Sequence, residues 1–381
     1  MPLLQRVRWT EVQWLPFIMA LVLTGFGLSF VISATMDPAS PSGWGREAEM
    51  QLIWWGLALG ACAVCVHLPL SLWRDTAIPM FIACLLLQVF MFLAAGSTLV
   101  PTIKGAHNWI AVGSLRVQPS EFYKIASLLV TARMLTNPAI DIRQFSWSCM
   151  VAAVGCLPAL LIAKEDLGSA LTFGPMVFGM LLLAGMPLRH LAIYLALVAF
   201  AATLGVMALP EDSYHIRRLH AWLNPEDFAD TQGYQTIRSL RSIGSGQWLG
   251  KGYGVGDQNL LGWLPEKHTD MIFAVVGEEL GFLGAALVPI LFCAFGWACL
   301  FAAARCRVPY GRLVITGFGC LVVGQAFINL AVVTGMMPVT GITLPFFSYG
   351  GSSLLGTYIA LGIVMSASLA RQRQLGASQY L

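Results

Sequence analysis

One aspartate in this sequence has the surroundings that acid–base chemistry requires. Asp270 ends the segment Leu264-Pro-Glu-Lys-His-Thr-Asp270, where a long polar stretch meets an apolar one. A carboxylate that is partly desolvated at such a boundary has a raised pKa, which suits a general base. Glu266 and His268 are close enough in the chain to assist it. Composition alone favours a solvated loop end at Asp270, so both interpretations stay open at this point.

A glutamate and a lysine form a second candidate pair. Pro119 suits the first turn of a helix, and Gln118 or Ser120 could cap that helix. Glu121 and Lys124 are then three positions apart and share one helix face. An ion pair at the edge of a membrane span is costly unless protein or water surrounds it. The pair is therefore either a wall of a polar cavity or a structural link between helices.

Three further segments hold unusual polar residues. They are Lys104-Gly-Ala-His-Asn-Trp109, Asp166-Leu-Gly-Ser169 and the segment 338–351, which contains Ser348 and Tyr349. The glycines and serines of the last segment suit either tight helix packing or the kinked start of a span, and packing is the simpler interpretation. Whether these segments meet depends on the elements that carry them.

Long uncharged runs separate the polar segments. The chain has 381 residues, 57% hydrophobic and 11% charged, whereas soluble domains carry about 25% charged residues. Runs without Asp, Glu, Lys or Arg cover residues 12–36, 50–73, 76–103, 144–163, 167–188, 190–210, 280–304 and 313–370. A membrane span needs about 20 apolar residues, so the last run fits two spans, and 119–136 gives a tenth despite its charges. We therefore expect an all-α, polytopic membrane protein with about ten transmembrane helices.

The distribution of charge predicts how the chain is oriented. An even number of spans puts both termini on one side, and that side carries 11 basic and 3 acidic residues, a net charge of +8. The other side carries 11 basic and 16 acidic residues, a net charge of −5. Because cytoplasmic loops are rich in Lys and Arg, both termini are expected in the cytoplasm and the polar segments on the outer face. The whole-chain charge of +3 does not suggest nucleic-acid binding.

The first apolar run and the cysteines give two smaller expectations. The run is long and lacks a small-residue cleavage site, so we interpret it as a retained span and not as a signal peptide. All nine cysteines lie in or beside apolar spans. Cys62 and Cys65 have the spacing of a redox or metal motif, but they lie inside a span without a second pair. We therefore expect them to pack in the core.

The longest connection, about 211–270, lies between the seventh and eighth spans. A loop of this length in a compact membrane protein is usually functional or contacts a partner. Its start, Tyr214–Leu223, mixes basic and apolar residues at helical spacing. That pattern predicts an interfacial helix with Arg217 and Arg218 toward the headgroups and its apolar residues inward, or a plain surface anchor. The segment 244–256 is rich in glycine, so it is flexible or tightly turned, and it lacks the pattern of a nucleotide-binding loop.

Five motifs together resemble one protein family. They are Gln118–Glu121, Asp166–Gly168, Gly233–Leu240, Trp263–Gly281 and Leu344–Ser352. In this order they resemble the SEDS family (shape, elongation, division and sporulation proteins), and the resemblance covers essentially the whole chain. It implies a single membrane domain over residues 1–381.

The resemblance also implies an activity and a location. Members of the family are peptidoglycan glycosyltransferases, which polymerise lipid II at the outer surface of the bacterial plasma membrane. They work with a class B penicillin-binding protein that crosslinks the strands. The motif Pro338-Val-Thr-Gly and the short tails resemble the elongation-type branch, which maintains cell shape, more than the division-type branch.

The resemblance further assigns roles within the site. Asp270 is the essential aspartate, and Glu121 and Lys124 belong to the active cavity. The donor already carries a good pyrophosphate leaving group, so one base suffices to accept the proton of the acceptor's 4-hydroxyl, whereas a glycosidase needs two carboxylates. An α-linked donor then gives a β-1,4 product with inversion. Membrane-embedded grooves between the spans are expected to hold the undecaprenyl chains.

The developing pyrophosphate charge must be offset by cations. Lys104, Lys124, Arg217 or Arg218, and a divalent cation (Mg²⁺ or Mn²⁺), are the candidates. The residues expected to bind substrate are Lys104, Trp109, Gln118, Ser120, Glu121, Lys124, Arg217, Arg218, Glu266, His268, Ser348 and Tyr349.

One departure from the family pattern concerns the donor side of the site. The family commonly has two basic residues between Ala106 and Trp109, and this chain has His107 and Asn108. Either another basic residue substitutes for them, or pyrophosphate binding depends more on the metal. Met271, at a position where Phe is usual, is expected to be tolerated.

Two other functions remain possible from the sequence. A lipid II flippase or another transporter would also have ten spans with charges inside the membrane, although the charged motifs here gather at one face and not at the midplane. A non-catalytic scaffold of the cell-wall machinery would use the long loop only to dock partners.

Overall fold

The structure is a computed structural model, and it describes residues 9–36, 43–103, 106–113, 115–208, 213–231, 233–257 and 261–370. A helix occupies each of the ten regions predicted to span the membrane. These helices are α1 (Leu15–Ala34), α2 (Arg46–His67), α3 (Leu70–Leu93), α4 (Ser120–Leu135), α5 (Phe145–Ile162), α6 (Leu167–Leu171) followed by α7 (Phe173–Leu183), α8 (Leu188–Ala208), α12 (Ile272–Arg305), α13 (Pro309–Val333) and α14 (Gly351–Leu369).

The helices have the length and composition of a polytopic membrane protein. Among the described residues, seven of them are long and apolar enough to cross a membrane, and the segments Leu167–Leu183 and Leu188–Ala201 are shorter apolar helices. Helix α4 has 16 residues and carries the charges noted above. The predicted all-α, multi-pass class is confirmed.

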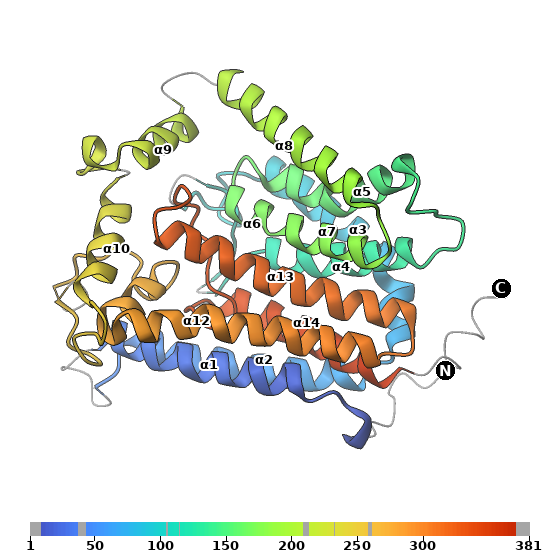
Figure 1. Ribbon diagram of the computed structural model, residues 1–381, viewed down its shortest axis with the longest axis horizontal. Coiled ribbons are helices and arrows are strands. Elements are labelled where there is room, and N and C mark those ends of the chain that lie inside the picture. The colour runs from blue at the N-terminus through green and yellow to red at the C-terminus, as the bar shows by residue number, and fades with distance from the viewer. Residues whose placement is uncertain are drawn as a thin grey trace.

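Helix α13 forms the centre of the bundle. It packs against α12, α7, α14 and α4, while α14 packs along α2 and α12 along α1 (Figure 1). Its contact with α7 is close because Gly324 has no side chain: an added Cβ would lie 2.3 Å from Pro175. Close approach at small residues is the usual way in which membrane helices pack. Helix α8 lies at the edge of the bundle and leans away from it (Figure 1).

The two ends of the described chain lie on the same side of the bundle. A short helix, η1 (Trp9–Glu11), precedes α1. The backbone N–H of Gln13 donates a hydrogen bond to the hydroxyl of Ser368, near the end of α14, at 3.3 Å. This contact agrees with the even number of spans predicted from the sequence.

The first long connection contains the only two strands of the described residues. Strands β1 (Ile110–Val112) and β2 (Leu115–Val117) pair antiparallel, with Ala111 opposite Arg116. Gly113 makes the turn with a φ of +63°. This hairpin is a small addition to a helical protein and leads directly into α4.

The second long connection is folded. It holds α9 (Tyr214–Leu223), the 3₁₀ turn η2 (Pro225–Phe228) and α10 (Tyr234–Ser245). Together with the loops around them, α9 and α10 lie beyond the ends of the long helices (Figure 1). The predicted helix at the start of this connection is confirmed.

Helix α9 is attached to the protein. The guanidinium of Arg218 donates to the backbone oxygen of Val339 at 2.8 Å, and the indole N–H of Trp222 donates to that of Gly335 at 2.9 Å. Arg218 is half-buried, and this hydrogen bond joins it to the loop between α13 and α14. Arg217 and Leu223 are both exposed on the surface of α9.

The glycine-rich segment is tightly turned, which decides between the two predicted alternatives. Gly281 has φ +65° and ψ −162° and interrupts α12. The N–H groups of Lys251 and Gly252 donate to the carbonyls of Glu278 and Glu279, each at 3.0 Å, and Phe282 N–H donates to the carbonyl of Gln247 at 2.7 Å. The turn thus satisfies the backbone groups that the kink frees, as burial requires.

The kink also explains why α12 begins before the predicted span. The uncharged run starts at residue 280, but the helix starts at Ile272 and includes Glu278 and Glu279, both fully buried. Lys251 contacts the Glu278 carboxylate at 2.9 Å, and Ser33 donates a hydrogen bond to that of Glu279. A search for uncharged runs ends at any glutamate. It cannot recognise a glutamate that is buried in a span because its partner comes from a distant part of the sequence.

Candidate active site

Asp270 lies at the point where the long connection enters α12. Its side chain is 7% exposed, so the interpretation as a solvated loop end is wrong. The hydroxyl of Thr269 lies 3.0 Å from Oδ1, and the amide of Gln235, on α10, lies 3.5 Å from Oδ2. The carboxylate is thus held between the start of α12 and the folded part of the loop.

The turn before Asp270 brings a second carboxylate close to it. Glu266 adopts a φ of +51°, and its backbone oxygen accepts a hydrogen bond from the N–H of Met271, which closes the turn. One carboxylate oxygen of Glu266 also lies 3.0 Å from the hydroxyl of Thr269. That hydroxyl has one proton, so it can serve only one of the two carboxylates at a time.

The segment 344–349 supports the same turn from the side of α14. The N–H of Tyr349 donates to the backbone oxygen of His268 at 2.9 Å, and the two rings meet edge to face at 5.6 Å. The hydroxyl of Ser348 accepts the N–H of Leu344 at 2.9 Å. Gln51, on α2, donates to the backbone oxygen of Ser348 at 3.1 Å. Ser348 and Tyr349 therefore shape the loop that faces His268.

Burial also changes the basicity of two groups in these loops. It lowers the pKa of Lys267, against the opposing effect of the carboxylates of Glu279 and Glu47. It raises the pKa of the Tyr349 hydroxyl, again with a contribution from Glu47. Both side chains are half-buried, and partial removal from water strengthens electrostatic interactions.

The predicted pair of Glu121 and Lys124 is confirmed as a buried ion pair. Lys124 Nζ lies 2.8 Å from Glu121 Oε1, and both side chains are buried. The same ammonium donates to the side-chain oxygen of Gln325, on α13, at 3.0 Å. The pair therefore links α4 to α13, which agrees with the structural interpretation. It does not line the cavity described next.

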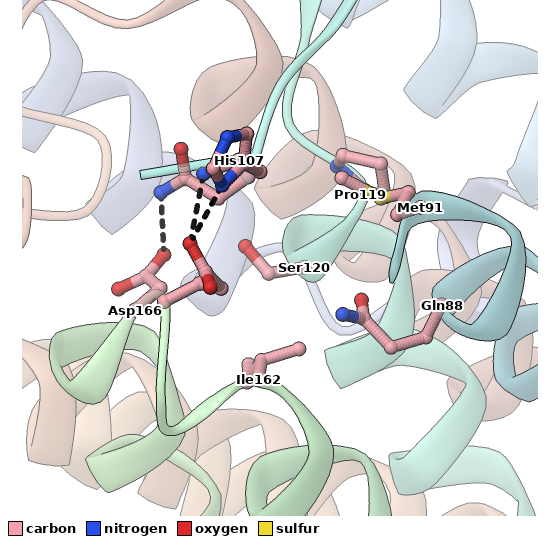
Figure 2. Close-up of a pocket in the computed structure, with 9 residues that line it drawn as sticks. Gln88, Met91, His107, Pro119, Ser120, Ile162 and Asp166 are labelled. Carbon is pink, nitrogen blue, oxygen red and sulfur yellow. Dashed lines mark hydrogen bonds and ion pairs between the residues drawn. The ribbon is translucent and has the colours of Figure 1, made fainter. Parts of the chain in front are cut away.

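A second polar group surrounds a small cavity between α3, α4 and α5 (Figure 2). The backbone N–H of His107 donates to Glu165 at 2.9 Å, and the imidazole lies 3.4 Å from the same oxygen. The amide of Gln118 donates to Asp166 at 2.8 Å, and Asn108 lies 3.5 Å from the same carboxylate. The cavity has room for about one water molecule.

These contacts correct the predicted helix cap. Helix α4 begins at Ser120, but no side chain caps it. The hydroxyl of Ser120 lies 3.5 Å from that of Ser169, and Gln118 is bound to Asp166. Asp166 itself caps α6, because its Oδ1 accepts the N–H of Ser169 at 2.8 Å.

The contacts also show how His107 and Asn108 are held. His107 and Asn108 each lie beside a carboxylate of the turn between α5 and α6, so both are attached to protein groups. Trp109, next in the chain, is half-buried. Lys104, a predicted phosphate ligand, lies outside the described residues.

The predicted polar segments therefore meet at one end of the bundle. Gln118 reaches Asp166, Lys124 reaches α13 through Gln325, and the turn before Asp270 reaches Tyr349. Among the described residues, no three His, Cys, Asp or Glu side chains gather closely enough to hold a metal ion alone.

Sequence reasoning missed four amide side chains of this site. Gln235 contacts the carboxylate of Asp270, Asn329 donates to its backbone oxygen at 2.8 Å, and Gln51 and Gln325 hold the neighbouring loop. Gln325 and Asn329 are the only amide side chains in α13. Polar side chains inside an apolar span were the signal that could have identified them.

The chain matches a protein-family model over residues 13–373, and the model describes FtsW, RodA and SpoVE as cell cycle proteins. It is 35% identical to a probable peptidoglycan glycosyltransferase FtsW of Geobacter metallireducens, over 92% of this chain and 93% of that protein. It is 34% identical to stage V sporulation protein E of Bacillus subtilis, over 84% and 86%.

Solved structures give the same result. A chain from a study of a peptidoglycan synthase complex is similar with a TM-score of 0.77 and 28% identity, over 94% of this chain and 97% of that one. The rod shape determining protein RodA of Thermus thermophilus is similar with a TM-score of 0.69 and 28% identity, over 95% and 98%. These similarities and the five motifs agree: the chain belongs to the FtsW, RodA and SpoVE family of membrane proteins, the SEDS family.

Proposed function

We propose that this protein is a peptidoglycan glycosyltransferase that polymerises lipid II at the outer face of the plasma membrane. The observation that carries the proposal is the position of Asp270, a buried carboxylate at the end of a folded outer loop, in a chain whose relatives are named peptidoglycan glycosyltransferases. Burial beside polar groups is what a general base requires.

The proposed reaction needs one base and several cations. Asp270 accepts the proton of the acceptor's 4-hydroxyl as that oxygen attacks the anomeric carbon of the donor, and the undecaprenyl pyrophosphate leaves with inversion. General-base assistance of this kind contributes about 10²–10⁴-fold to the rate. The pyrophosphate requires positive charge, and Arg218 lies beside the outer loop between α13 and α14. Lys124 is a second candidate, and its ammonium also contacts Glu121 and Gln325.

A divalent cation, Mg²⁺ or Mn²⁺, is part of the proposal. Glu266 and Asp270 lie on either side of the Thr269 hydroxyl, and Mg²⁺ is typically bound by one or two carboxylates together with substrate phosphates. Glu266 would hold the ion while Asp270 acts as the base, and the ion would neutralise charge on the leaving group. We expect polymerisation to stop with EDTA and to return with added Mg²⁺ or Mn²⁺. Full activity after exhaustive chelation would remove the metal from the proposal.

We further propose that the protein works with a class B penicillin-binding protein. Support comes from the similar chain whose structure concerns coordinated polymerisation and crosslinking by a peptidoglycan synthase complex. We also propose an elongation-type role, in the maintenance of cell shape, on the basis of the motif Pro338-Val-Thr-Gly. The division-type names of several sequence relatives favour the alternative. Depletion distinguishes the branches: loss of rod shape supports elongation, and filamentation supports division.

Reconstitution tests the activity against the rival transporter. The purified protein, with its partner, is supplied with labelled lipid II, and both glycan polymer and movement of lipid II across vesicles are measured. The proposal expects polymer without transport. Transport of lipid II without polymer would establish the flippase instead, and neither activity would favour a scaffold.

A further inference from the structure

Two amide side chains project from the central helix α13 at positions one turn apart. Gln325 is 4% exposed and Asn329 is 1% exposed. Buried amides in an apolar span are costly unless their hydrogen bonds are made. Within the described residues, three of the four hydrogen bonds that these side chains make end at Asp270 or at the 342–343 backbone, and the fourth joins Gln325 to Lys124.

Asn329 joins two segments through one amide group. Its Nδ2 donates to the backbone oxygen of Asp270 at 2.8 Å and to that of Ile342 at 2.7 Å. An amide nitrogen has two protons, so both are used. The residue proposed as the base is thereby attached to α13 and to the loop that precedes α14.

Gln325 continues the connection toward α4. Its Nε2 donates to the backbone oxygen of Thr343 at 3.0 Å, next to the residue that Asn329 contacts. Its Oε1 accepts from the ammonium of Lys124 at 3.0 Å. A continuous path of hydrogen bonds therefore runs from the Glu121–Lys124 pair, through the two amides and residues 342–343, to Asp270.

We infer that Asn329 is a positioning residue for Asp270, and that Gln325 fixes Lys124 and the 342–343 backbone in the same frame. The inference rests on the proposed function. Neither amide touches the carboxylate of Asp270. They act by holding its backbone and the facing loop at a set separation. A displacement of about 1 Å in such a site can cost about 10²-fold in rate.

Substitution at Asn329 tests the inference. Asn329→Leu has a similar volume but no donors, and Asn329→Gln keeps both donors on a longer stem. We expect kcat to fall at least about tenfold in each variant, with KM for lipid II changed by less than about threefold, because substrate contacts remain. Asn329→Gln is included because Asn329→Leu leaves two buried carbonyls without donors and could fail to fold.

The control is Thr316→Val on the same helix. Thr316 is 3% exposed, and its hydroxyl has no hydrogen-bond partner among the described residues. The control should keep the wild-type kcat. A purely structural role of Asn329 predicts less folded protein with unchanged kcat per folded molecule. That result, or a wild-type kcat in folded Asn329→Gln, overturns the inference.

Asp270→Asn, measured alongside, distinguishes a failure of the proposed function from a failure of the positioning role of Asn329. If Asp270→Asn polymerises normally, the proposed function fails, whatever Asn329 does. If Asp270→Asn is inactive while folded Asn329 variants keep the wild-type kcat, only the positioning role fails.

Discussion

The ion pair of Glu121 and Lys124 differs from a surface salt bridge because both side chains are removed from solvent. A surface pair contributes about 0–1 kcal/mol. A buried pair is different, since removing one partner leaves an uncompensated charge in a medium of low dielectric constant. The amide of Gln325 alone cannot neutralise the charge of either residue.

Lys124→Met should therefore destabilise the protein strongly, by about 3–5 kcal/mol. The double variant Glu121→Gln/Lys124→Met should recover most of this loss, because no charge is then left buried. Thermal unfolding in detergent measures both variants. If the double variant unfolds as early as Lys124→Met alone, the two residues do not interact as the structure indicates.

At the scale of elements, the kink in α12 is joined to the glycine-rich turn of the long connection. Gly281 has a backbone conformation that residues with a side chain rarely adopt, and an added Cβ would lie 2.4 Å from the backbone nitrogen of Gly250. The turn that contains Gly250 also carries Lys251 to Glu278. A substitution at Gly281 or Gly250 should therefore disturb the packing of this turn in the connection that ends at Asp270.

Gly281→Ala should lower stability by about 1–3 kcal/mol through backbone strain, and by more through the clash with Gly250. Gly60→Ala, on an exposed face of α2 with no atom near the added Cβ, is the matched control and should be neutral or slightly stabilising. Differential thermal unfolding compares the two. Equal shifts would show that the kink does not require glycine.

Lys251 should stabilise the same turn in a pH-dependent way. Partial burial lowers the pKa of Lys251, but the hydrogen bonds with Asp257 and Glu278 outweigh it, so its pKa is raised in the folded protein. The stability contributed by Lys251 is then complete below the unfolded value of about 10.4 and is lost as pH rises through the raised pKa. The difference in unfolding temperature between wild type and Lys251→Met should shrink above about pH 10. A difference that grows with pH would contradict this reasoning.

The elements also show the limits of prediction from sequence. Uncharged runs located the helices, because a span must exclude unpaired charge. They could not place the start of α12, where Lys251 pairs with buried Glu278 and Ser33 donates a hydrogen bond to buried Glu279. They also could not orient Arg218, whose partner is a backbone oxygen more than a hundred residues away.

For the whole molecule, topology brought the site together. The alternation of spans predicted the polar segments on one face, and the charge asymmetry of +8 against −5 predicted that this face is the outer one. The structure joins the segments through Gln118–Asp166, Lys124–Gln325 and His268–Tyr349. The uncharged runs and the charge asymmetry did not single out Asp270, whereas the family motifs did. The amides Gln325 and Asn329 were missed because their partners are mostly backbone groups, which a sequence pattern does not reveal.

The most direct test of the account is lipid II polymerisation by Asp270→Asn, purified with its partner. The substitution keeps the size of the side chain and removes the base. Asp227→Asn, the same change at an exposed aspartate of the same loop, is the control. The account predicts that Asp270→Asn is folded, binds its partner and makes no glycan polymer, while Asp227→Asn is normal. Wild-type polymerisation by Asp270→Asn would contradict its role as the base.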